Sequence, residues 1–135
     1  MSDTERAMDL PVHKNMRENP PMVRVSEPVT RVVEEMLSED IGAIIVVNKN
    51  GDPLGIITEK DMIERVVEPD RDIDTTLAQE VMSAPLISIE EDRSTGEALD
   101  LMRENNIRRL AVVRGNTLKG IVTERRLLET VFKGI

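Results

Sequence analysis

Residues 55–62 read Gly-Ile-Ile-Thr-Glu-Lys-Asp-Met, and residues 120–127 read Gly-Ile-Val-Thr-Glu-Arg-Arg-Leu. Both stretches begin with a glycine and two branched apolar residues, which are followed by a threonine and a glutamate. The preceding apolar segments also correspond, since residues 41–47 align with residues 107–113. Self-similarity at a fixed period is the sequence signature of a repeated structural unit. The chain therefore predicts two copies of one unit, and Met16 recurring as Met82 extends the repeat upstream.

Each copy has the pattern of a β-α-β-β-α unit. Apolar residues recur at the spacing of one helical face at Val29, Val32, Val33, Met36 and Leu37, and again at Ala98, Leu99 and Met102. Continuous apolar runs predict buried strands at 43–47 and 110–113. A second strand is expected after the following turn, at 54–57 and 118–122, and short strands are expected at 22–25 and 86–89. A last helix in each copy is lined by Met62, Ile63, Val66 and Val67, or by Leu127, Leu128, Val131 and Phe132.

The repeat gives an α/β fold with a simple domain plan. We expect a tail at 1–12, a first unit at 13–68, a linker at 69–78 and a second unit at 79–135. A unit of about 55 residues is only marginally stable alone. Because the strands have few polar positions, we expect the two units to pack on each other through their sheets, related by a pseudo-twofold axis.

Composition excludes several classes of function. The 135 residues carry a net charge of −8, which disfavours non-specific binding to nucleic acid or to an anionic membrane. The chain has no cysteine and one histidine, so thiolate, iron–sulfur and multi-histidine metal sites are excluded. No apolar run approaches the roughly 18 residues of a membrane-spanning helix, and the charged residues 1–6 show no apolar stretch of the kind expected of a signal peptide. A cytoplasmic protein is expected.

The repeated Gly-hydrophobic-hydrophobic-Thr-x-x-Asp/Arg motif resembles a tandem pair of CBS (cystathionine-β-synthase) domains, also called a Bateman module. The resemblance covers residues from about 13 to 133. It implies a regulatory module that holds an adenosine-containing ligand (AMP, ADP, ATP or S-adenosylmethionine) in a cleft between the two units. It also implies association of such pairs into homodimers. No tightly bound cofactor, metal site or enzymatic activity is expected.

Thr58 and Asp61 stand at the entrance to the last helix of the first copy. Thr-x-x-Asp is close to a capping box, in which both side chains satisfy backbone groups at a helix start. A helix N-terminus also attracts phosphate, and a carboxylate accepts hydrogen bonds from the two hydroxyls of a ribose. The resemblance implies that Thr58 lies on the phosphate side and Asp61 on the ribose side of a bound nucleotide.

The second copy departs from this motif. Thr123 is present, but Arg126 stands where the first copy has its aspartate. A cation in the first helical turn opposes the helix dipole, and a guanidinium cannot accept hydrogen bonds from a ribose. We therefore expect one competent site built around Asp61 and a degenerate second site around Thr123 and Arg126.

Two further arginines favour a phosphorylated ligand. Arg108 and Arg109 open a predicted strand of the second copy, where the first copy has the uncharged Gly42 and Ala43. The resemblance implies that basic residues here contact the phosphates of the ligand held by the other unit, and Arg125 adds charge. Adenine nucleotides are accordingly preferred over S-adenosylmethionine. Backbone groups near Met22 and Val23, with those of Gly42 and Ala43, are expected to frame the adenine.

Two readings of function remain open beside a sensor of adenine nucleotides that signals to a partner protein in trans. One is a dimerising interaction scaffold whose clefts are vestigial, and the other is a sensor of S-adenosylmethionine. An enzyme is not expected, since the sequence offers no nucleophile, metal site or poised carboxylate pair, and His13 has no triad partners nearby.

Overall fold

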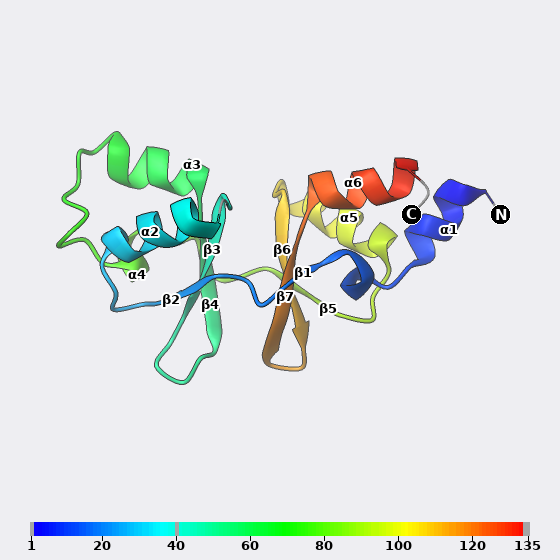
Figure 1. The fold of residues 1–135 in the computed structure, drawn as a ribbon, viewed down its shortest axis with the longest axis horizontal. Helices are drawn as coiled ribbons and strands as arrows, with labels where there is room; N and C mark the ends of the chain where they lie inside the picture. The colour runs from blue at the N-terminus through cyan, green and yellow to red at the C-terminus, as the bar shows by residue number, and fades with distance from the viewer. Residues whose placement is uncertain (1, 40, 134–135) are drawn as a thin grey trace. The chain divides into compact units, whose positions relative to one another are not determined.

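Strand pairing divides the chain into two units, each with its own sheet. The computed structural model describes residues 2–39 and 41–133 (Figure 1). We call Pro20–Ile87 the continuous unit. The discontinuous unit combines the residues up to Asn19 with those from Ser88 onward. Both show the predicted β-α-β-β-α order, so the duplicated α/β fold is confirmed.

The continuous unit is built on a three-stranded sheet of order β2-β3-β4. β2 (Met22–Arg24) runs parallel to β3 (Ala43–Val47), which pairs antiparallel with β4 (Pro53–Thr58). The crossover from β2 to β3 is helix α2 (Val29–Glu39). After β4 come α3 (Glu59–Met62), a π-helical turn at Ile63–Val67 and the short α4 (Ala78–Val81).

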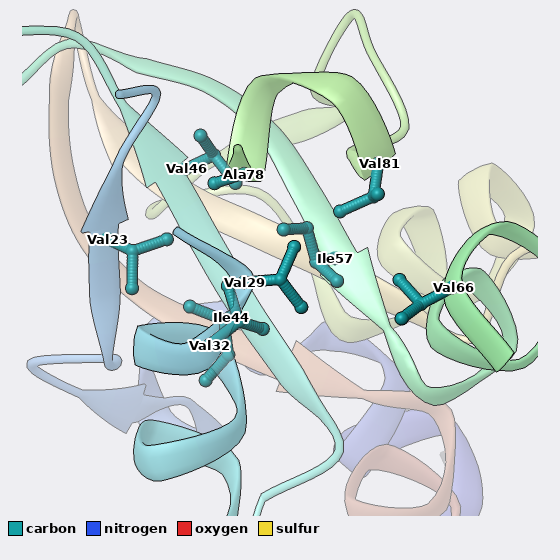
Figure 2. Packing of buried hydrophobic residues seen from close by; sticks show 9 residues of the cluster. All are labelled: Val23, Val29, Val32, Ile44, Val46, Ile57, Val66, Ala78 and Val81. Atoms are coloured by element: carbon teal, nitrogen blue, oxygen red, sulfur yellow. The ribbon is translucent and has the colours of Figure 1, made fainter. Parts of the chain in front are cut away.

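The core of this unit lies between the sheet and helices α2 and α3, which share one side of it (Figure 1). Figure 2 shows nine buried apolar side chains there: Val23, Val29, Val32, Ile44, Val46, Ile57, Val66, Ala78 and Val81. The sequence pattern places Leu37 on the same helical face, yet its side chain is 78% exposed. At about 100° per residue it lies about 80° from Val29, at the margin of the apolar stripe.

The discontinuous unit has a four-stranded sheet of order β1-β7-β6-β5. Its C-terminal part comprises β5 (Ser88–Glu90), α5 (Thr95–Asn105), β6 (Arg109–Arg114), β7 (Thr117–Thr123) and α6 (Glu124–Lys133). Its N-terminal part adds α1 (Asp3–Asp9), a 3-10 turn at Val12–Asn15 and the edge strand β1 (Arg17–Glu18). The predicted strand at 86–89 begins two residues later, because its pairing with β6 starts at Ser88.

The first 12 residues differ from the predicted tail. Helix α1 is capped by Ser2 and contacts α5 and α6, and Ala7 is buried. The backbone N–H of Thr95 donates to the carbonyl of Leu10 at 2.8 Å, and Val12 is completely buried. Short-range sequence patterns do not show this role, because it comes from docking onto residues more than 80 positions away.

Residues 69–78 likewise differ from a solvated linker. The N–H of Val29 donates to the carbonyl of Thr76 at 2.8 Å, and the N–H of Ala78 donates to the carbonyl of Glu27 at 2.8 Å. The first bond satisfies a donor at the start of α2 and the second a donor at the start of α4, since the first N–H groups of a helix have no partner within it. The acidic, proline-containing stretch therefore ends in a segment that belongs to the continuous unit. No helix in the described parts of the chain has the length and apolar character to cross a membrane.

Candidate ligand site

Strand register places several predicted site residues on one face of the continuous unit's sheet. Ala43 lies opposite Thr58, and Met22 lies opposite Ile45. Opposed residues share a face and successive residues alternate. Met22, Ala43 and Thr58 therefore project from the face opposite to the Ile44 and Ile57 core. Ser83, which bridges to Ile56, joins this same face at the outer edge of β4.

The Thr58–Asp61 pair forms a complete capping box at the start of α3. The backbone N–H of Asp61 donates to Thr58 Oγ1 at 3.4 Å. Asp61 Oδ2 accepts from the Thr58 backbone N–H at 2.9 Å and from the Thr58 hydroxyl at 3.1 Å. The predicted cap is confirmed, and it holds the Asp61 side chain at 8% exposure.

The other carboxylate oxygen of Asp61 faces two further residues. Ser83 Oγ donates to Asp61 Oδ1 at 2.8 Å, whereas Arg65 Nε lies 3.9 Å away, beyond hydrogen-bond distance. Arg65 instead donates through Nη1 to the carbonyls of Val81 at 3.1 Å and Met82 at 2.5 Å. Arg65 thereby attaches the segment around Ser83 to the helix that begins beside Asp61.

The cap limits what Thr58 can offer a ligand. A hydroxyl has one hydrogen to donate, and the Thr58 hydroxyl directs it to Asp61. Capping and donation to a phosphate therefore compete for one hydrogen, although the sequence suggests that both are compatible. The acceptor side differs, because Oδ1 has one hydrogen bond from Ser83 and a carboxylate oxygen accepts two.

The remaining residues expected near the adenine lie in different environments. The Val23 side chain is 1% exposed and belongs to the core cluster, so only its backbone is available for a ligand. Met22 is 47% exposed, and Ala43 is buried. The carbonyl of Gly42 accepts from the Glu59 N–H at 3.1 Å, which satisfies another donor at the start of α3.

The discontinuous unit repeats this framework with arginines at the corresponding positions. Arg109 lies opposite Thr123 and Arg17 opposite Ile121, so both share the face that carries Thr123. The Arg126 N–H donates to Thr123 Oγ1 at 3.1 Å, and the Glu124 N–H donates to the Arg108 carbonyl at 2.8 Å. Four arginines of this unit have uncharged or acidic counterparts in the continuous unit: Arg17 corresponds to Ser83, Arg108 to Gly42, Arg109 to Ala43 and Arg126 to Asp61.

Ser83 lies beside Asp61 in the candidate site, and the sequence analysis did not single it out. Its signal lies in the repeat, because Ser83 follows Met82 as Arg17 follows Met16. Both methionines pack against a glycine of the repeated motif: a Cβ on Gly55 would lie 2.9 Å from Met82 Sδ, and one on Gly120 would lie 2.6 Å from Met16 Sδ. The duplicated packing aligns the residue after each methionine with the start of the last helix.

The described residues bring no three histidine, cysteine, aspartate or glutamate side chains close enough to hold a metal ion.

The fold and the duplicated helix start define a tandem CBS pair. A model of the CBS domain matches residues 8–68 and again residues 78–133. The chain belongs to the CBS domain family, whose tandem pairs are generally regulatory modules.

Relatives support this assignment at the sequence level. The chain is 38% identical over 105 residues to an uncharacterized protein of Methanopyrus kandleri, covering 77% of this chain and 54% of that protein. It is 35% identical over 100 residues to a CBS domain-containing protein of Bacillus subtilis, covering 74% and 70%. The first three curated relatives are longer, and the chain spans 54%, 32% and 42% of their lengths.

Solved structures share the fold. An uncharacterized conserved protein from Pyrococcus horikoshii has a TM-score of 0.83 at 28% identity, covering 91% of this chain and 92% of that one. The CBS domain of a bacterial CNNM/CorC family Mg²⁺ transporter, in complex with ATP, also has a TM-score of 0.83. Its identity is 15%, with 98% of this chain and 94% of that chain covered, so this likeness concerns the fold alone.

Proposed function

We propose that this CBS pair binds an adenine nucleotide (AMP, ADP or ATP) through the residues around Thr58 and Asp61 and signals the bound state to a partner protein in trans. The observation that carries the proposal is the Asp61 carboxylate, held beside the sheet face of Thr58 with acceptor capacity left on Oδ1. A fixed carboxylate is a suitable acceptor for the vicinal hydroxyls of a ribose.

The contrast between the two units supports a single ribose site. Asp61 has its counterpart in Arg126, which donates only, so the second helix start lacks the acceptor that a ribose needs. The ATP complex of a transporter's CBS domain supports the proposal further, because a protein of this fold holds an adenine nucleotide.

The phosphates are assigned to Arg108 and Arg109. A guanidinium group binds two phosphate oxygens through parallel, charge-assisted hydrogen bonds. The corresponding positions of the continuous unit carry the uncharged Gly42 and Ala43. Thr58 is a weaker candidate, since donation to a phosphate would break its hydrogen bond to Asp61. This assignment favours a phosphorylated ligand over S-adenosylmethionine.

A thermal-shift panel of AMP, ADP, ATP, NADH and S-adenosylmethionine tests the proposal. A ligand at 100 times its Kd stabilises the folded state by about 2.7 kcal/mol, which corresponds to a shift of the order of 10 °C for a domain of this size. Arg109→Ala should weaken ATP binding more than adenosine binding. Equal losses of affinity for ATP and adenosine would contradict the phosphate role of Arg109. A thermal shift with S-adenosylmethionine alone would identify that compound, and not a nucleotide, as the ligand.

A dimerising scaffold is the second candidate, and exposed apolar pairs on the last helices favour self-association. Ile63 and Val67 are 53% and 67% exposed, and their counterparts Leu128 and Phe132 are 38% and 77% exposed. Each pair is spaced i, i+4, so its side chains adjoin on one helical face. We propose that a second copy of the chain covers these faces in a homodimer. Dimerisation with no response to any ligand of the panel would favour the scaffold.

A further inference from the structure

The geometry points to Ser83 as a second ribose-recognition residue. Ser83 accepts a hydrogen bond from one hydroxyl of the sugar, and Asp61 accepts one from the other. This inference rests on the proposed nucleotide-binding function and assigns a residue outside the repeated Gly-to-Asp motif. It concerns specificity, because a receptor with two acceptors distinguishes a ribose from either of its deoxy forms.

The backbone of Ser83 is fixed before any ligand binds. Its N–H donates to the carbonyl of Ile56 at 2.8 Å, and its carbonyl accepts from the N–H of Ile56 at 3.0 Å. This reciprocal pair of hydrogen bonds attaches Ser83 to the edge of β4 at Ile56, which lies two residues before Thr58. Arg65 holds the preceding carbonyls of Val81 and Met82. Ser83 is therefore positioned by the same elements that position the capping box.

The hydrogen-bond directions leave the hydroxyl of Ser83 as an acceptor. Its one hydrogen goes to Asp61 Oδ1 at 2.8 Å, and a hydroxyl oxygen that donates still has two lone pairs. Oδ1 accepts that hydrogen bond and retains capacity for another. Ser83 Oγ and Asp61 Oδ1 are thus two acceptors that lie 2.8 Å apart. This separation is similar to that between the two oxygens of a vicinal diol.

The other unit shows what the pair would lose without these residues. Arg17 corresponds to Ser83 and Arg126 to Asp61. Both acceptors are replaced by side chains that only donate, so neither position of this unit can accept a hydrogen bond from a hydroxyl of a diol. A purely structural serine beside Asp61 would not require its counterpart to change in the same sense.

The test measures binding of ATP, 2′-deoxy-ATP and 3′-deoxy-ATP to the full chain by titration calorimetry. In Ser83→Ala we expect ATP binding to weaken about tenfold, the effect of one hydrogen bond. One deoxy form, which lacks the hydroxyl that Ser83 receives, should bind this variant as tightly as ATP does. Discrimination against the other deoxy form should persist, and Ser83→Thr should restore discrimination against both.

A matched control separates recognition from stability. Ser94 Oγ accepts from the Glu97 N–H at 3.1 Å at the start of α5. Ser94→Ala therefore removes, like Ser83→Ala, a serine hydroxyl that is hydrogen-bonded to the first turn of a helix. It should lower stability and leave ATP binding unchanged. Equal losses for ATP and both deoxy forms in Ser83→Ala, or none, would overturn the inference while ATP binding to the wild type stands. If the wild type binds none of the three, the proposed function fails and this inference fails with it.

Discussion

Asp61 and Arg126 occupy the same position of the two CBS units, three residues after the threonine that precedes the last helix. The N–H of each donates to its threonine, at 3.4 Å for Asp61 and 3.1 Å for Arg126. Only the aspartate side chain also accepts hydrogen bonds from its threonine, because a guanidinium has no acceptor. One backbone framework therefore presents a carboxylate in one unit and a cation in the other.

Asp61→Ala should abolish the thermal shift produced by the nucleotide that binds the wild type. It should also lower the free energy of unfolding by about 1 kcal/mol, because the capping box is lost. Arg126→Ala is the matched control and should leave the ligand response nearly intact. Thermal unfolding with and without ligand measures both quantities. Loss of the response in Arg126→Ala alone would reverse the assignment of the site.

Arg126→Asp should rebuild the missing capping box at the start of α6. The new carboxylate is placed to accept from Thr123 and to interact favourably with the helix dipole, where the arginine opposes it. We expect a gain of a few tenths to about 1 kcal/mol in the free energy of unfolding, measured by urea denaturation. A loss of stability would show that Arg126 makes interactions that outweigh the cap.

The strong apolar patterns predicted the secondary structure well. The run at 43–47 matches β3 residue for residue, and the capping box at Thr58 and Asp61 is confirmed. Both follow from short-range rules, namely burial of continuous apolar strands and satisfaction of backbone donors at a helix start.

Long-range docking was beyond the sequence pattern. The packing of Val12 and the role of Thr76 depend on partners distant in sequence, and the patterns of both segments are those of a tail and a linker. The last helices show a related limit, since periodicity places Val67 and Phe132 on apolar stripes although both are largely exposed. Periodicity identifies a stripe, whereas the width of the stripe covered by the unit depends on tertiary packing.

Asn15→Val should stabilise the protein. Asn15 is 7% exposed, and its Nδ2 has no hydrogen-bond partner among the described residues. The corresponding residue of the other unit is Val81, which is completely buried in the core. Removing an unsatisfied buried donor should raise the free energy of unfolding by roughly 1–3 kcal/mol, measured by urea denaturation. A destabilised variant would show that the amide is satisfied in solution.

Glu80 should make the continuous unit more stable at neutral pH than in acid. The pKa of its carboxyl is lowered, first by the hydrogen bond from the Leu77 N–H and then by the charge of Arg71. A lowered folded-state pKa gives stability that is present above the unfolded pKa, near 4.3, and is lost as pH falls through the folded value. Glu80→Gln should therefore be less stable than wild type at pH 7, and the difference should shrink toward pH 3. Urea midpoints at the two values measure this, and a constant difference would contradict the role of the charge.

Replacing Leu128 and Phe132 together by serine should shift the chain toward monomer. Both side chains are exposed on α6, so their loss should leave folding intact, whereas a covering copy of the chain would lose their apolar contacts. A twofold interface contains each residue twice, so we expect the dimer Kd to rise at least tenfold in sedimentation equilibrium. Leu37→Ser is the control, since Leu37 is 78% exposed on α2 and lies outside the proposed interface. An unchanged Kd in the double variant, or an equal rise in the control, would place the interface elsewhere.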